Sequence, residues 1–205
     1  MIYDITPPIS EAIKVWPGDT PLSREILGDI NQGDNITLSA LHATVHLGAH
    51  ADAPNHYSSQ GADISTRSLD YYLGRCQLIK VKAARGKRIL PTQIQLPIQE
   101  QRVLFATGSY PNPNEFNTDF AALSPELIEW LHKQGVITIG LDTPSIDLFD
   151  SEKLPSHQAV FQYDMAILEG LILADIPEGC YELIALPLKL QDFDASPVRA
   201  VLRSL

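Results

Sequence analysis

Cysteine is scarce in this chain, and its scarcity excludes two classes of site. The 205 residues include only Cys76 and Cys180, which lie far apart in the sequence. Neither belongs to a C-x-x-C pair, so a thiolate zinc site and a disulfide scaffold are both excluded. We expect two buried free thiols in a reducing cytosol.

Basic residues and long apolar runs are also scarce. The chain has 15 Lys and Arg against 25 Asp and Glu, a formal net charge of −10. This balance argues against nucleic acid and anionic membranes as partners, because both require a basic surface. The N-terminal segment lacks the features of a secretory signal, and no apolar run approaches the roughly 20 residues of a membrane span, so the cytoplasm is the expected location. One basic cluster, residues 80–88, is expected to be a solvated strand end and loop.

The remaining composition is that of an ordinary globular domain. Hydrophobic residues make up 44% of the chain and charged residues 20%. The length is near the upper end of one compact domain, for which roughly 100–200 residues are usual. No internal repeat or low-complexity segment divides it. We therefore expect a single domain over residues 1–205.

The hydrophobic pattern predicts many short strands and few helices. Strands are expected at 2–5, 36–46, 78–81, 103–106, 136–141, 166–168 and 181–186. Helices are expected at 68–73, 125–134 and 157–164. The alternation in 36–46 predicts a strand with one apolar side, followed by a turn or loop. This mixed order predicts an α/β fold whose core is a mixed β-sheet or partial barrel flanked by helices.

Histidine is concentrated in one segment. Four of the six histidines lie between residues 42 and 56, and residues 46–56 read HLGAHADAPNH. Imidazole and carboxylate groups are ligands for zinc, manganese and iron, so three histidines and an aspartate in eleven positions indicate a metal site. His42 and His132 lie outside this segment, and we expect ordinary packing for the first and a solvated helix face for the second.

Local geometry supports this interpretation. In an extended chain His50 and Asp52 point the same way, because side chains alternate with a period of two. The glycine at position 48 permits a turn that brings His46 back towards them. A proline precedes His56 and stiffens the chain, which suits a histidine held beside the metal rather than bound to it.

The histidine segment resembles the cyclase superfamily of metal-dependent hydrolases, whose signature is H-x-G-T-H-x-D-x-P-x-H. Ala49 stands where the signature has threonine, and this variant resembles the bacterial kynurenine formamidase branch. The resemblance extends over essentially the whole chain. Its further matching segments are residues 15–19, 154–157, 167–171 and 194–200.

The resemblance implies a site with two divalent metal ions. His46, His50 and Asp52 would hold the first ion and His157 the second, with Asp52 and Glu169 bridging both. Without the resemblance, Glu169 would be taken for a surface glutamate. Zinc is the expected metal, while manganese, cobalt and iron stay open.

The resemblance also implies an activity, which is the hydrolysis of N-formyl-L-kynurenine to L-kynurenine and formate in tryptophan degradation. His56 corresponds to the proton donor and acceptor, and Trp16 to the aromatic residue that binds the substrate. A swivelling β/β/α fold and a homodimer are further implications. Two alternatives stay open: a cyclic-amide or isatin-type hydrolase on the same scaffold, and a metal-binding protein without turnover.

Overall fold

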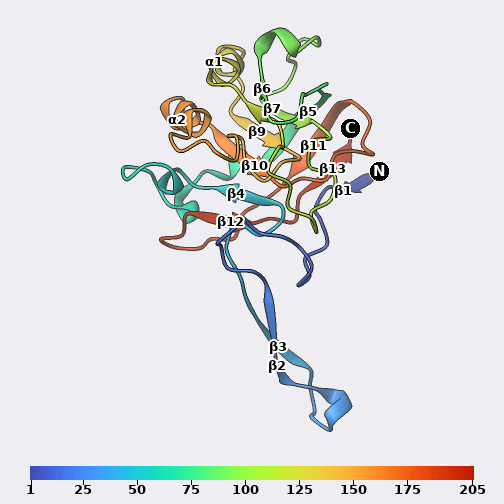
Figure 1. The fold of residues 1–205 in the computed structure, drawn as a ribbon. Coiled ribbons are helices and arrows are strands. Elements are labelled where there is room, and N and C mark those ends of the chain that lie inside the picture. The colour runs from blue at the N-terminus through green and yellow to red at the C-terminus, as the bar shows by residue number, and fades with distance from the viewer.

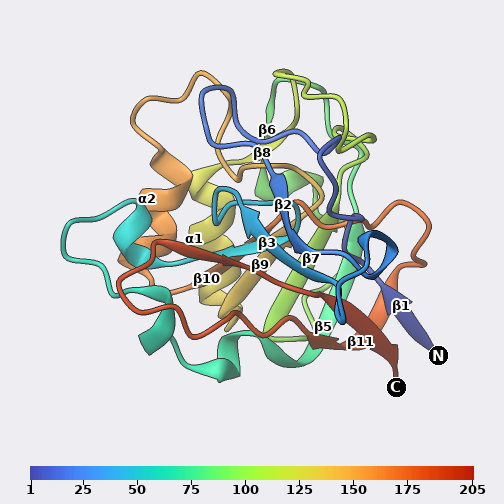
Figure 2. The same cartoon turned by 90° about the horizontal axis from the view of Figure 1, so that it is seen from below.

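A nine-stranded mixed sheet forms the centre of the computed structural model, which describes all residues 1–205 (Figure 1). Across the sheet, the strands are β1 (Ile2–Asp4), β13 (Val201–Ser204), β11 (Gly179–Ile184), β5 (Leu73–Lys80), β7 (Arg102–Ala106), β9 (Thr138–Leu141), β10 (Ala166–Glu169), β4 (His50–Asp52) and β12 (Ala195–Pro197). The four strands from β5 to β10 are parallel, and all other pairs are antiparallel. The sheet curls into a half-barrel (Figure 2), which confirms the predicted α/β fold.

Two helices, α1 (Pro125–Lys133) and α2 (Pro155–Gln162), pack side by side against the sheet. The helix α1 begins where the sequence predicts, because the Ser124 hydroxyl accepts a hydrogen bond from the Leu127 N–H. Its end is also as predicted, since Gly135 follows with a φ of 84°. None of the helices combines the length and the apolar character of a membrane-spanning segment.

The sheet separates two hydrophobic cores. On β7, Leu104 belongs to one core, whereas Val103 and Phe105 belong to the other, as alternation along a strand requires. The second core also receives the buried apolar side chains of both helices. The α1 side chains in it are Leu127, Ile128 and Leu131. Because both faces are covered, the central strands have the continuous apolar sequences that the prediction used.

The expected helix at 68–73 is only a single 3-10 turn. It covers Leu69–Tyr71, and the chain enters β5 at Leu73. Six residues are too few to stabilise an isolated helix, and the buried strand that follows determines the local path. The other 3-10 turns are Ile30–Gln32, Pro54–His56, Ile64–Thr66 and Pro91–Gln93, and a small parallel pair joins β6 (Arg88–Ile89) to β8 (Ala122–Leu123).

A hairpin outside the main sheet corrects the prediction for residues 36–46. Its strands β2 (Ser23–Gly28) and β3 (Leu38–His42) pair with each other and extend away from the body as an arm (Figure 1). Leu41 on the expected apolar side is 74% exposed. The alternating pattern therefore identified a strand, but no part of the chain covers its apolar side. His42, expected to be packed, is exposed on this arm.

The segment after Gly48 also differs from expectation. Gly48 makes the predicted turn with a φ of 61°, but residues 50–52 are then the buried strand β4 and not a loop. The expectation for the cysteines needs a smaller correction, because Cys76 is buried whereas Cys180 is partly exposed; both are free thiols.

Candidate active site

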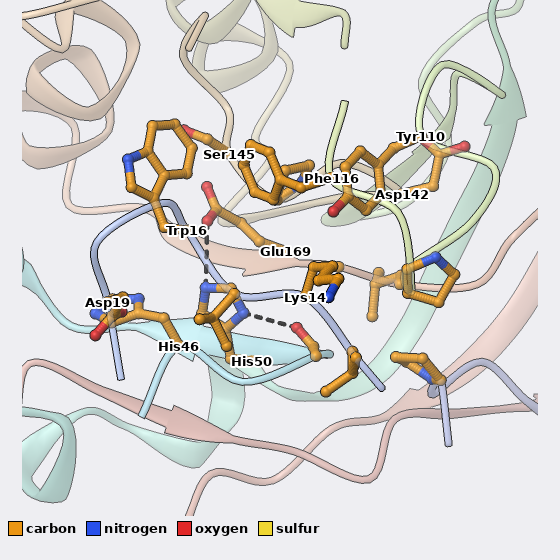
Figure 3. Close-up of a pocket in the computed structure, with 18 of the residues that line it drawn as sticks. Lys14, Trp16, Asp19, His46, His50, Tyr110, Phe116, Asp142, Ser145 and Glu169 are labelled. Atoms are coloured by element: carbon orange, nitrogen blue, oxygen red, sulfur yellow. Dashed lines mark hydrogen bonds and ion pairs between the residues drawn. The ribbon is translucent and has the colours of Figure 1, made fainter. Parts of the chain in front are cut away.

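The strand β4 places two of the predicted ligands beside a third. It lies between β10 and β12, with His50 opposite Glu169 and Asp52 opposite Ala195. His50 and Asp52 share one face, as the sequence predicts from the period of two. The antiparallel pairing with β10 therefore brings Glu169 to the histidine segment across more than half of the chain (Figure 3).

The five residues predicted to hold metal converge on one point. The Oδ1 atom of Asp52 lies 3.1 Å from His46 Nδ1 and 3.5 Å from His50 Nε2, and its Oδ2 atom lies 3.5 Å from His157 Nε2. Glu169 has the same arrangement, with Oε2 3.3 Å from His50 Nε2 and Oε1 3.7 Å from His157 Nε2. Each carboxylate thus has one oxygen towards His50 and the other towards His157.

The chemistry of this cluster fits a divalent cation. Asp52 is almost completely buried, yet neither of its oxygens accepts a hydrogen bond. A buried carboxylate without donors is costly unless a positive charge compensates it. Burial alone would raise the pKa of Asp52, but His157 and His46 beside it hold that pKa well below its usual range. One set of donors that could hold an ion is His50, Asp52 and Glu169, all buried.

The histidines are oriented by acceptors on their outer nitrogens. His50 directs Nδ1 at the Gly48 carbonyl oxygen at 2.9 Å, and His46 directs Nε2 at Asp194 Oδ2 at 3.0 Å. An acceptor on one ring nitrogen leaves the other nitrogen free to bind a metal, which is the usual arrangement around metal-binding histidines. Burial lowers the pKa of His46, but Asp194 and Asp52 outweigh this effect and raise it to about 10.

His157 lies in the first turn of α2, and the buried carboxylate of Asp147 holds its side chain. Asp147 Oδ2 lies 2.8 Å from His157 Nδ1 and also accepts the N–H groups of Ser156 and His157. Arg88 contacts the same carboxylate at 2.7 Å. Burial lowers the pKa of His157, but Asp147 and Asp52 together raise it to about 10. Arg88 therefore has a structural partner, whereas the sequence placed it in a solvated basic cluster.

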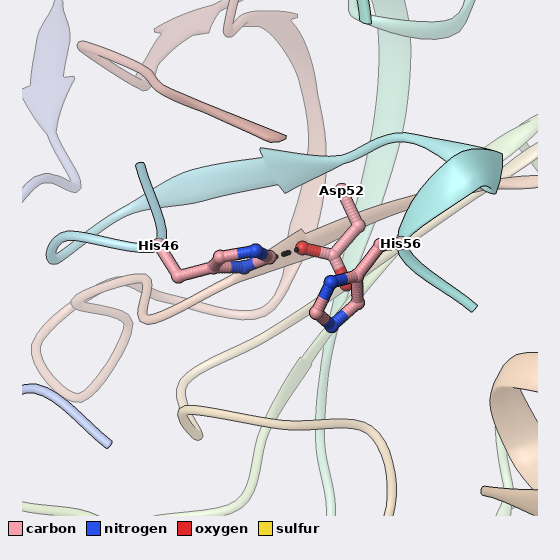
Figure 4. A group of neighbouring side chains, drawn as sticks. All are labelled: His46, Asp52 and His56. Atoms are coloured by element: carbon pink, nitrogen blue, oxygen red, sulfur yellow. Dashed lines mark ion pairs between the residues drawn. The ribbon is translucent and has the colours of Figure 1, made fainter. Parts of the chain in front are cut away.

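His56 lies at the edge of the cluster, in the turn that Pro54 begins. Its side chain is 34% exposed, and its ring centre is 4.2 Å from that of His46 and 6.2 Å from that of His157. Figure 4 shows it next to His46 and Asp52, and donor atoms of these three residues lie within 4.8 Å of one another. Proximity is thus compatible with a ligand as well as with the predicted acid–base group.

A cavity of about 560 Å³ opens onto the cluster, and Trp16 forms part of its wall (Figure 3). Trp16 packs against Phe149 and Phe116, with ring centres 5.1 and 5.6 Å away. His50, His56, His157 and Glu169 line the same cavity. The structure therefore brings the predicted substrate-binding aromatic and the predicted ligands to one space.

Three aspartates near the site were not singled out from the sequence. Asp142 follows β9 and accepts the N–H groups of Thr107 and Gly108 at the cavity wall. Burial raises the pKa of Asp142. A carboxylate after a buried parallel strand is a recognisable signal, because ligands bind at that edge of such sheets. Asp147 lies in a loop and has no comparable signal, while Asp194 belongs to one of the matching segments.

Similarity to known proteins identifies the family. A family model for cyclases matches residues 3–148. The chain belongs to the cyclase family. A potential metal-dependent hydrolase with cyclase activity is 32% identical, with a TM-score of 0.84 over 98% of this chain and 96% of that one. A predicted metal-dependent hydrolase from Bacillus stearothermophilus is also 32% identical, with a TM-score of 0.83 over 98% and 97%.

More distant cyclase-fold proteins share the architecture. Isatin hydrolase A from Labrenzia aggregata, solved with benzyl benzoate, is 19% identical, with a TM-score of 0.83 over 98% of this chain and 93% of that one. This likeness concerns the fold alone. Family membership and the donor cluster together identify this cyclase-family chain as a hydrolase of the metal-dependent kind, with a site suited to a divalent ion.

Proposed function

We propose that this cyclase-family chain is a metal-dependent arylformamidase that hydrolyses N-formyl-L-kynurenine to L-kynurenine and formate in tryptophan degradation. The observation that carries the proposal is that Trp16 lines one cavity together with the histidines and Glu169 of the cluster. A substrate with an aryl ring and a nearby formamide matches such a cavity. Ala49, the residue by which the motif resembles the formamidase branch, is completely buried in the apolar core.

Each residue has a definite part in the proposed reaction. Metal ions held by the cluster would supply the Lewis acidity that activates the attacking water and polarises the formyl carbonyl. His56 would accept a proton from that water and return it to the aniline nitrogen as the C–N bond breaks, because an anilide anion leaves poorly. Trp16 would pack on the aryl ring and orient the formyl group towards the cluster.

We propose two ions per chain, with zinc as the metal. The supporting observation is that Asp52 and Glu169 each direct one oxygen towards His50 and the other towards His157. Carboxylates in this arrangement suit bridging ligands. Nitrogen and oxygen donors are compatible with zinc and also with manganese, cobalt or iron.

Two other functions use the same site. An isatin-type hydrolase is the nearer one, because solved proteins of this fold include isatin hydrolases. Trp16 and Ala49 favour the formamidase, since both belong to the segments that resemble that branch. A metal-binding protein without turnover is the more distant one, and the open cavity beside His56 argues against it.

The test is turnover by metal-depleted and metal-restored protein. The purified chain is stripped with a chelator, titrated with zinc, and supplied with N-formyl-L-kynurenine or with isatin. We expect release of L-kynurenine that is abolished by chelation and that rises with zinc up to two ions per chain.

If the protein opens isatin and does not hydrolyse the formamide, the proposed substrate is wrong, whereas a hydrolase on this scaffold is still supported. Zinc binding with no turnover of either compound would support the non-catalytic alternative. Activity that reaches its maximum at one ion per chain would overturn the two-ion proposal.

A further inference from the structure

One carboxylate oxygen contacts two different histidines of the site. Asp194 Oδ2 lies 3.0 Å from His46 Nε2 and 3.3 Å from His56 Nδ1. Asp194 immediately precedes β12, and its carbonyl oxygen accepts the Ala53 N–H at 2.8 Å. The residue is thus held against the strand that carries the proposed ligands, and its side chain joins a proposed ligand to the proposed acid–base group.

This contact determines which nitrogen of His56 is available. An ionised carboxylate only accepts hydrogen bonds, so the nitrogen that faces Asp194 must carry the proton. His56 therefore has its hydrogen on Nδ1 and its lone pair on Nε2. His46 differs from His56 in this respect, because both of its ring nitrogens face carboxylates: Nε2 faces Asp194 and Nδ1 faces Asp52.

Resting on the proposed function, we infer that Asp194 is a positioning residue that orients His56 for proton transfer. It holds the Nδ1–H group, so that Nε2 accepts the proton of the attacking water. The same Nε2–H then donates to the departing aniline nitrogen as the C–N bond breaks. The imidazole is regenerated, and Asp194 keeps its charge throughout. A carboxylate that fixes the tautomer and orientation of a catalytic histidine has this effect in other hydrolases.

A second interpretation of the same contact must be separated from this one. Asp194 could act only through His46, by orienting a metal ligand, or through the fold, by its link to Ala53. Both would lower activity in an Asp194 variant. Only the positioning role requires that Asp194→Ala cause no further loss of activity in a protein that already lacks His56.

The experiment is a double-mutant cycle on the zinc-restored protein. The variants are Asp194→Ala, His56→Ala and the double variant, with Asp194→Asn as the conservative change. Asp192→Asn is the matched control, because Asp192 is an exposed aspartate of the same loop whose side chain contacts neither histidine. Formamide hydrolysis and zinc content are measured for each.

We expect Asp194→Ala saturated with zinc to lower kcat by about 10–100-fold, while the lost contact to His46 should also weaken its zinc affinity. Asp194→Asn should fall between Asp194→Ala and wild type, since its amide oxygen still accepts a hydrogen bond. The Asp194→Ala change should have almost no effect in the His56→Ala background. The control should behave as wild type.

A second readout does not depend on activity. Ring nitrogen shifts from 15N NMR distinguish the two tautomers of a neutral histidine, and His56→Ala assigns the His56 signals. We expect the Nδ1–H tautomer in the zinc-restored wild type and a mixture of tautomers in Asp194→Ala. This measurement tests the Asp194–His56 contact even if N-formyl-L-kynurenine is not a substrate, so failure of the proposed function remains distinguishable.

Three results would overturn the inference. They are an equal loss from Asp194→Ala with and without His56, a loss in Asp194→Ala that saturating zinc restores, and an unchanged His56 tautomer in that variant. The first two would assign Asp194 to His46 or to the fold, and the third would show that it does not determine the state of His56.

Discussion

At the scale of single residues, Trp16 is the side chain that most directly links the cavity to a substrate class. It is partly exposed at the cavity wall and rests on Phe149 and Phe116. This support fixes the plane of the indole, so an aryl substrate meets a preformed surface. The chain has only one other tryptophan, Trp130. It belongs to α1, packs against the second core and does not line the cavity.

We predict that Trp16→Ala lowers kcat/KM for N-formyl-L-kynurenine by about 30–150-fold. The loss combines the ring contact and its buried area, together roughly 2–3 kcal/mol. Zinc content should stay at the wild-type value. A small formamide without an aryl group should be a poor substrate for both proteins and should show little change between them.

Trp130→Ala is the matched control for this change. It removes an equally large side chain and should lower thermal stability without altering the preference between the two substrates. Equal losses on both substrates in Trp16→Ala would mean that Trp16 supports the fold and does not recognise the ring.

The residues of the candidate site differ in how far they could be predicted. His46, His50 and Asp52 lie within seven positions, so their spacing alone indicates a common site. Glu169 reaches them only through the pairing of β10 with β4, which no local pattern encodes. The spacing of residues did not indicate Glu169, so only the family resemblance identified it.

At the scale of elements, the end of β10 is fixed to the turn at Gly48 by close backbone packing. Gly170 has a φ of 66°, and a Cβ added there would lie 2.2 Å from the Gly48 carbonyl oxygen. That carbonyl is the acceptor that orients His50. The contact therefore connects the position of Glu169 to the orientation of His50.

We predict that Gly170→Ala weakens metal binding as well as stability. The added methyl group must displace the Gly48 carbonyl and with it the acceptor of His50, so zinc affinity should fall at least about 10-fold. The Tm should fall by more than the strain of an alanine with a left-handed backbone would cause alone. Zinc titration and thermal unfolding measure the two effects.

Gly86→Ala separates the clash from the backbone strain. Gly86 has nearly the same φ, 65°, but a Cβ there would meet nothing within 4 Å. A left-handed alanine costs about 1–2 kcal/mol, so this control should lose several degrees in Tm and keep its zinc affinity. Similar behaviour of the two variants would show that the contact between Gly170 and Gly48 does not hold the site.

The elements also show what local patterns can predict. The helix α1 carries its own start and stop signals in Ser124 and Gly135, and the sequence predicted it almost to the residue. The strand β4 has only three residues, and its pairing partners β10 and β12 come much later in the chain. Its identity as a strand depends on tertiary pairing, which explains why a turn or loop was expected there.

At the scale of the whole molecule, the arm formed by β2 and β3 is the feature that a single chain does not explain. Six large apolar residues on it are between 49% and 74% exposed. They are Ile26, Leu27, Ile30, Ile36, Leu38 and Leu41. Apolar groups gathered on such an extension are typical of protein interfaces. In the sequence the arm lies between Trp16 and His46, so both of its ends continue into segments of the candidate site.

We propose that a second copy of the chain covers this arm, in line with the homodimer that the family resemblance implies. Two-fold symmetry is the commonest arrangement of identical chains, and it would bury both arms in one closed assembly. Burial of a large apolar side chain contributes about 1.5–3 kcal/mol, so six such residues on each arm would contribute substantially to association.

We predict that shortening the arm converts a dimer into a monomer. Glu25 and Ala40 are directly opposite in the hairpin, so residues 26–39 can be replaced by Asn-Gly, which favours a tight hairpin turn. Light scattering should give twice the chain mass for the wild type and the single-chain mass for the shortened protein. Zinc content should be unchanged, because the ligands lie outside the replaced segment. Leu90→Asp, at a 45% exposed leucine on the body, is the control and should remain dimeric. A shortened protein that is still dimeric would move the interface away from the arm, and a monomeric wild type would refute the homodimer itself.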